Sequence, residues 1–113
     1  MKLYIVVRED LSFGSQMAQS LHAFREFVEY HPDKEREWYK TSNTIVVLGI
    51  QDHNELLNLS FKAISKNVSF SMFREPDRDN EVTAIAFEPG ERTSEFLAHL
   101  RLAGKPSIDY ELF

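Results

Sequence analysis

The sequence contains no cysteine. A disulfide scaffold and a metal site built from thiolates are therefore excluded. The four histidines lie far apart along the chain without metal-ligand spacing, and neither an HExxH nor a CxxC motif occurs. Glycine-rich phosphate loops (GxGxxG, GxxxxGKS/T) and the GxSxG nucleophile elbow are also absent. We therefore expect neither a cofactor nor a bound metal.

Long apolar runs are absent as well. No run approaches the roughly 20 residues needed to span a bilayer. The N-terminal apolar stretch ends at Arg8, which is too short for the core of a signal peptide, and no cleavage site follows it. These features predict a cytoplasmic protein that does not contact membranes.

Basic residues are fewer than acidic ones, and the formal net charge is −5. A general nucleic-acid binder usually carries a basic face, so this charge argues against that class. Arginines are nevertheless spread along the chain, and a fold can assemble them into a local patch.

What the sequence does contain is enough apolar material for one core. Of the 113 residues 42% are hydrophobic, and nine are Phe. This length is close to the usual size of one domain and too short for two. We expect residues 1–113 to form a single domain.

Four segments have the pattern of β-strands. Residues 3–7 and Thr44–Ile50 are continuous apolar runs, typical of strands buried on both faces of a parallel sheet. Residues 68–73 alternate with period two. Residues 82–87 form a fourth apolar run, which ends at a Pro-Gly pair.

Helical spacing separates these strands. Met17, Leu21 and Phe24 recur at intervals of four and three, which predicts a helix that places them in the core and ends near His31. Either Ser12 or Ser15 is suited to cap its start.

Further helices are expected over residues 32–40, after a cap at Asp52, and over residues 93–100. The last two strands are joined by too few residues for a crossover, so they should pair antiparallel. The prediction is an α/β fold: a four-stranded mixed sheet with helices on both faces, in three α/β/α layers.

The turn from the first strand into the first helix carries a signature. It resembles that of the archaeal and eukaryotic type of peptidyl-tRNA hydrolase: an Arg-x-Asp-Leu step, a Gly-Lys-x-Ala-Ala-Gln helix start and a His-Ala pair. The residues that match are Arg8, Asp10, Leu11, Gly14, Ala18, Gln19, His22 and Ala23. Segments 42–50 and 83–89 are similar to the second and closing strands of that family.

Two departures from the family pattern stand out. The family has Lys directly after the Gly, where this sequence has Ser15. The family's Asp-Ala-Gly-x-Thr loop before the last strand is rebuilt, and Arg74, Glu75 and Asp77 stand near its place. The chain thus resembles a divergent, shortened member of the family.

The resemblance implies hydrolysis of the ester that joins a peptidyl group to tRNA, without a cofactor. Under that interpretation Glu75 or Asp77 would activate water. Gln19 and Ser15 would stabilise the oxyanion. Arg8, Arg74 and Arg78 would bind phosphates of the RNA. The predicted supporting residues are Asp10, Gly14, His22 and Thr83. The implied partners are tRNA or peptidyl-tRNA and, as in many members of the family, a second copy of the chain.

Simpler roles remain open for several of these residues. Ser15 would serve as a helix cap, Glu75 and Asp77 as parts of a solvated turn, and His22 as a structural histidine. The alternative function is a catalytically weak or inactive relative that binds tRNA, another RNA or a protein through the same cleft.

Overall fold

The computed structural model describes residues 1–104, so the part of the predicted 1–113 domain beyond Gly104 lies outside the described residues. The elements follow one another in the predicted order, with one added turn of 3-10 helix, η1. They are β1 (Lys2–Arg8), α1 (Phe13–Tyr30), α2 (Pro32–Thr41), β2 (Thr44–Ile50), α3 (His53–Ser65), β3 (Phe70–Glu75), η1 (Pro76–Arg78), β4 (Glu81–Phe87) and α4 (Glu91–Phe96).

The four strands form one mixed sheet in the order β2-β1-β4-β3. β1 and β2 are parallel, with Lys2 opposite Thr44 and Arg8 opposite Ile50. β4 runs antiparallel to both β1 and β3. The predicted mixed sheet and the antiparallel pairing of the last two strands are therefore confirmed.

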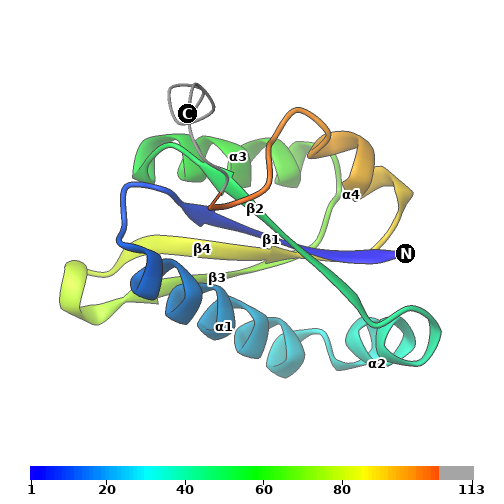
Figure 1. Ribbon diagram of the computed structural model, residues 1–113. Helices are drawn as coiled ribbons and strands as arrows, with labels where there is room; N and C mark the ends of the chain where they lie inside the picture. The colour runs from blue at the N-terminus through cyan, green and yellow to red at the C-terminus, as the bar shows by residue number, and fades with distance from the viewer. Residues whose placement is uncertain (105–113) are drawn as a thin grey trace, which may run out of the picture.

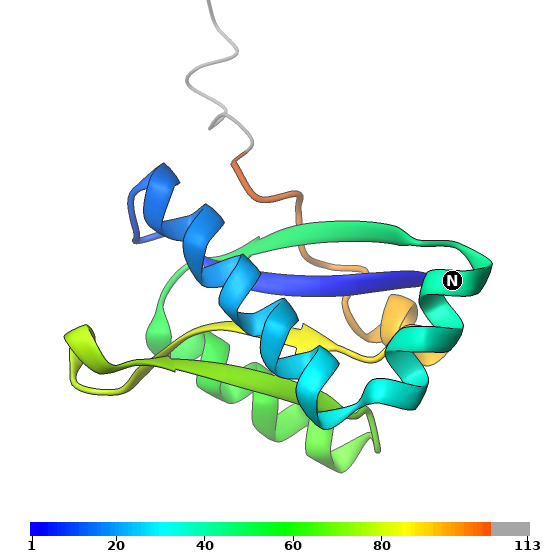
Figure 2. The ribbon, with the colours of Figure 1, turned by 90° about the horizontal axis from the view of Figure 1, so that it is seen from below.

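Helices cover both faces of the sheet, which confirms the three-layer prediction. Figure 1 shows α1 and α2 on one side of the sheet and α3 and α4 on the other. Seen from below in Figure 2, α1 runs diagonally across its face, and it packs on β4, β3 and β1. Since β1 leads into α1 and β2 into α3, the chain leaves the carboxyl ends of these two strands toward opposite faces.

Each face has its own core. On the α1 face Phe27 and Trp38 are almost completely buried, and the indole Nε1 of Trp38 donates 2.8 Å to the carbonyl of Thr44. On the α3 face Phe87 and Leu56 are fully buried. The residues of β1 alternate between the two cores, which explains why its sequence is apolar at every position.

The side of α1 that enters the core is not the one that the spacing predicted. Met17 and Leu21 are 67% and 69% exposed, whereas Gln19, Ser20, Ala23 and Phe27 are buried. Small side chains at Ser20 and Ala23 let the helix approach the sheet closely. The prediction that Met17 and Leu21 belong to the core is therefore wrong.

Three local predictions are also corrected. β3 begins at Phe70 rather than at residue 68, because Val68 closes α3 through a hydrogen bond of 3.0 Å to the carbonyl of Ala63. α4 covers Glu91–Phe96 rather than residues 93–100, because the chain then leaves the helix to run along β2. Gly14, which would suit a tight turn between the first strand and the helix, instead lies inside α1 with open space at its Cβ position, so no tight turn requires a glycine there.

Candidate active site

Gln19 links the first helix to two strands through two side-chain hydrogen bonds. The hydroxyl of Thr83 donates 2.6 Å to Gln19 Oε1. Gln19 Nε2 in turn donates 2.9 Å to Glu75 Oε1. Because Thr83 occupies the amide oxygen, the amide nitrogen must face the carboxylate. Gln19 and Thr83 are buried and Glu75 is half-buried, so the carboxylate lies where the network reaches the surface.

Local structure fixes both ends of this network. Ser12 caps α1, since its Oγ accepts 3.4 Å from the backbone N–H of Ser15. Ser15 precedes Gln19 by one helical turn on the same side of α1, so its hydroxyl is available to the site rather than used as the cap. Between β3 and β4 the register shifts after Phe73, which pairs with Ala84 while Arg74 pairs with Val82, so Thr83 is the extra residue of a bulge on β4, a feature that re-aims side chains.

The rebuilt acidic loop is a single turn of 3-10 helix, η1. Glu75 is its N-cap, and Oε2 accepts 3.5 Å from the N–H of Asp77. Asp79 and Asn80 then close the turn with positive φ angles of 55° and 60°, which Asp and Asn adopt more readily than most residues. Of the two predicted carboxylates, Glu75 therefore contacts Gln19, whereas Asp77 is exposed on η1.

Arg8 stands inside an ion-pair network rather than on a binding surface. Its guanidinium donates 2.9 and 2.8 Å to the two carboxylate oxygens of Asp10 and 2.7 Å to Glu81. These bonds raise the pKa of Arg8 and, through its hydrogen bonds, lower the pKa of Asp10 and of Glu81. Arg8 is only 4% exposed. The structure therefore gives no support to the predicted contact of Arg8 with RNA.

The two other predicted RNA-binding arginines are exposed near Glu75. Arg74 donates 3.3 Å to the carbonyl of Asn80 and forms no ion pair with residues 1–104. Arg78 lies on η1 and is also exposed. Neither arginine forms an ion pair within residues 1–104, and both lie on the exposed surface near Glu75 in the chain.

An aromatic stack beside the site was not foreseen from the sequence. The rings of His22 and Phe73 lie 4.4 Å apart with an angle of 13° between their planes. His22 follows Gln19 by one turn of α1, and Phe73 precedes Glu75 by two residues on the same face of β3. This spacing was visible in the sequence, but nothing there paired the helix with this strand.

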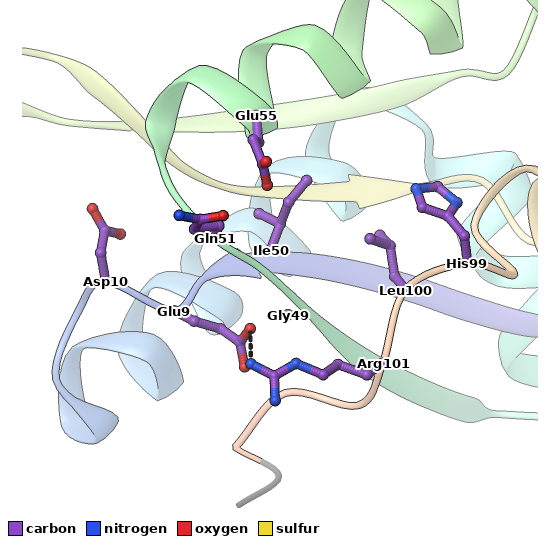
Figure 3. Close-up of a pocket in the computed structure, with 9 residues that line it drawn as sticks. All are labelled: Glu9, Asp10, Gly49, Ile50, Gln51, Glu55, His99, Leu100 and Arg101. Atoms are coloured by element: carbon purple, nitrogen blue, oxygen red, sulfur yellow. Dashed lines mark hydrogen bonds and ion pairs between the residues drawn. The ribbon is translucent and has the colours of Figure 1, made fainter. Parts of the chain in front are cut away.

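A polar hollow of about 530 Å³ lies outside the carboxyl ends of β1 and β2 (Figure 3). Arg101 and Glu9 both line it, and the guanidinium of Arg101 donates a hydrogen bond of 2.8 Å to the carboxylate of Glu9. The lack of a side chain at Gly49 makes room for Glu9, whose Cδ would lie 2.3 Å from an added Cβ. Of the predicted site residues only Asp10 lines this hollow, so we place the candidate site at Gln19 and Glu75 instead.

Within residues 1–104 no three His, Asp or Glu side chains are arranged to hold a metal ion. In the same part of the chain, no helix has the length and apolar character needed to cross a membrane.

The sequence of this chain and its three-layer fold can be compared with those of known proteins. A family described as Peptidyl-tRNA hydrolase PTH2 matches residues 1–103. A peptidyl-tRNA hydrolase from Methanocaldococcus jannaschii is 28% identical over 114 residues, covering 90% of this chain and 99% of the archaeal protein. A solved structure from Agrobacterium tumefaciens, of a protein of unknown function, has a TM-score of 0.66 at 13% identity and covers 91% of this chain and 97% of its own.

The fold and the family match thus define an α/β domain of the peptidyl-tRNA hydrolase type. This chain belongs to the peptidyl-tRNA hydrolase PTH2 family. The Agrobacterium structure supports the fold alone.

Proposed function

We propose that the protein hydrolyses the ester between a peptidyl group and the terminal ribose of tRNA. The observation that carries the proposal is the hydrogen bond from Gln19 to Glu75, which joins a fixed amide donor to a partly exposed carboxylate. Membership of the family supports peptidyl-tRNA as the substrate. Ester hydrolysis needs one group to take a proton from water and another to stabilise the oxyanion.

Glu75 is the proposed general base. Its carboxylate takes a proton as the water oxygen attacks the ester carbonyl carbon. The C–O bond to the ribose then breaks, and the same proton passes to the leaving ribose oxygen. A well-placed base contributes about 10²–10⁴-fold to such a reaction. Asp77 is the second predicted carboxylate, and its place on exposed η1 makes it the weaker candidate.

Gln19 is the proposed oxyanion donor. Its Nε2 has two N–H groups, and one of them binds Glu75. The other is available to the developing oxyanion, with the amide held in place by Thr83. Ser15, one turn earlier on α1, supplies a second donor. Loss of one such donor typically costs about 10²–10³-fold in rate.

Turnover of purified peptidyl-tRNA tests this proposal directly. Release of free tRNA above the buffer rate should fall about 10²-fold or more in both Glu75→Gln and Gln19→Ala. The matched control is Glu29→Gln, an exposed carboxylate on α1 whose one ion pair within residues 1–104 is with Arg25. No release by the wild type, with Glu75→Gln and Asp77→Asn equally inert, would sink the enzyme proposal.

The second candidate is a relative that binds tRNA, another RNA or a protein without efficient turnover. The observation that favours it is Ser15, which stands where the family has Lys. A variant Ser15→Lys separates the two functions. If the wild type binds peptidyl-tRNA without turnover and Ser15→Lys hydrolyses it, the binding function is favoured for the natural chain.

An apolar groove supports the predicted homodimer. It has a volume of about 560 Å³ and is lined by Ile5 and Val7 of β1, Ile45 and Val47 of β2, and Phe13, Met17, Leu21 and Phe24 of α1, among others. No charged side chain of the described residues lines it. The cytoplasmic location and the single 1–113 domain stay predictions.

A further inference from the structure

The second half of α1 and the outer edge of β3 enclose a groove beside the candidate active site. Its volume is about 520 Å³. The residues that line it are Glu26, Tyr30, His31, Phe70, Ser71, Met72, Phe73 and Arg74. Gln19, His22, Glu26 and Tyr30 follow one another on one side of α1 at intervals of three and four residues, so His22 lies on that side of the helix between Gln19 and the groove.

The His22–Phe73 stack stands at the junction of this groove with the site. Phe73 packs against the core of the α1 face, which holds its ring in place. His22 is exposed although one ring face is covered by Phe73 at 4.4 Å. Its opposite face is therefore the one open to solvent, as a flat surface at a fixed orientation. Farther along the groove, Tyr30 is 68% exposed.

We infer that this groove holds the unpaired 3′ strand of the tRNA, with a base stacked on the open face of His22; the inference rests on the proposed function. Proteins recognise unpaired RNA by stacking its bases on aromatic side chains. Arg74 lies next to Phe73 and has no carboxylate partner in the described residues, so its guanidinium is available to one phosphate. Glu26 lies farther along and offers an acceptor to base or ribose donors rather than to phosphate.

The charges of the groove favour a short single strand over a duplex. A duplex is bound through many phosphate contacts, which need several Lys or Arg side chains. Among the residues that line this groove Arg74 is the one Lys or Arg. Affinity should therefore come mainly from stacking and should depend only weakly on salt, with a slope near that of one phosphate contact.

The test is the binding of a short unpaired RNA that ends in CCA and carries no acyl group, measured by fluorescence anisotropy. We expect His22→Ala to weaken binding about 5- to 150-fold, the range of one base–aromatic stack. His22→Phe should restore binding, because it keeps a flat ring on Phe73. The matched control is His99→Ala, an exposed histidine that lines the hollow at the other edge of the sheet.

On peptidyl-tRNA the same His22→Ala variant should raise KM and leave kcat nearly unchanged. Equal RNA affinity of wild type and His22→Ala would overturn the inference, as would equal affinity for duplex RNA. If an uncharged peptide bound in the groove, and RNA binding did not depend on His22, the inference would also be overturned. The groove would then be assigned to the peptidyl group. RNA binding that depends on His22 without any turnover would support the groove and overturn the hydrolase proposal alone.

Discussion

The hydroxyl of Thr83 on β4 donates a 2.6 Å hydrogen bond to the side-chain carbonyl of Gln19 on α1. Thr83 is fully buried and Gln19 is 8% exposed, so water does not compete for this bond. It determines which way the amide points, and therefore which group of Gln19 faces Glu75. The orientation of one proposed catalytic donor thus depends on a residue 64 positions away in the sequence.

Thr83→Val should separate this positioning role from simple packing. The substitution keeps the shape of the side chain and removes the hydroxyl, which leaves Gln19 Oε1 buried without a donor. We expect a loss of about 1–3 kcal/mol in the free energy of unfolding. We also expect kcat on peptidyl-tRNA to fall with KM nearly unchanged.

Denaturant unfolding and steady-state kinetics measure these effects. Thr83→Ser is the control, because it keeps the hydroxyl and should retain most of kcat. If Thr83→Val kept the full kcat while Thr83→Ser lost it, the positioning role would be refuted.

The ion pair between Arg8 and Asp10 predicts a stability that depends on acid. Hydrogen bonds from Arg8 lower the pKa of Asp10 in the folded chain from its ordinary value of 3.8. The stabilisation is therefore complete above 3.8 and is lost as the pH falls through the lowered pKa of the folded state. Its size should be about 1 kcal/mol or less, because the side chain of Asp10 is 40% exposed.

Urea unfolding of wild type and Asp10→Asn at pH 7 and below pH 3 measures this contribution. The variant should be less stable at pH 7, and the difference should shrink in acid. Glu29→Gln serves as a control, since Glu29 and Arg25 are both well exposed. A difference between wild type and Asp10→Asn that is unchanged in acid would show that the carboxylate charge is not responsible.

We expect substitutions by Ala on the two sides of α1 to have very different effects on stability. Phe27 is fully buried on the sheet, so Phe27→Ala should cost about 3–5 kcal/mol in the free energy of unfolding. Leu21 is 69% exposed, so Leu21→Ala should change it by about 0.5 kcal/mol or less in the monomer. Thermal or urea unfolding at low protein concentration measures both. If Leu21→Ala lowered the free energy of unfolding strongly and Phe27→Ala only slightly, the side of α1 predicted from the spacing would be the one that faces the core.

The order of the elements and the pairing of the strands could be predicted from the sequence, because apolar strand runs and helical spacing are local patterns. The buried side of α1 was not, because two neighbouring sides of that helix both carry apolar residues. The small side chains of Ser20 and Ala23 determine which side of α1 packs on the sheet, and the spacing of apolar residues carries no information about side-chain size. In the site, the signature located Gln19, but its contact with Glu75 depends on a bulge and on pairing across 56 residues.

The exposed side of α1 leads to the last prediction, which concerns assembly. Met17 and Leu21 line the uncharged groove over β1 and β2, and burying such side chains against a second copy removes apolar surface from water. Two copies of a chain with net charge −5 repel each other. This repulsion is weakest where the contact surface carries no charge. We therefore expect sedimentation equilibrium to show a dimer.

Leu21→Glu should weaken that dimer, because a carboxylate would have to be buried in each copy. Loss of the apolar contact alone corresponds to about 10- to 100-fold in the dissociation constant. Tyr39→Glu on α2 is the matched control: Tyr39 is 61% exposed and does not line the groove, so the dimer should persist. A monomer at every concentration would contradict the predicted homodimer. A dimer that Leu21→Glu leaves intact would place the contact on another face.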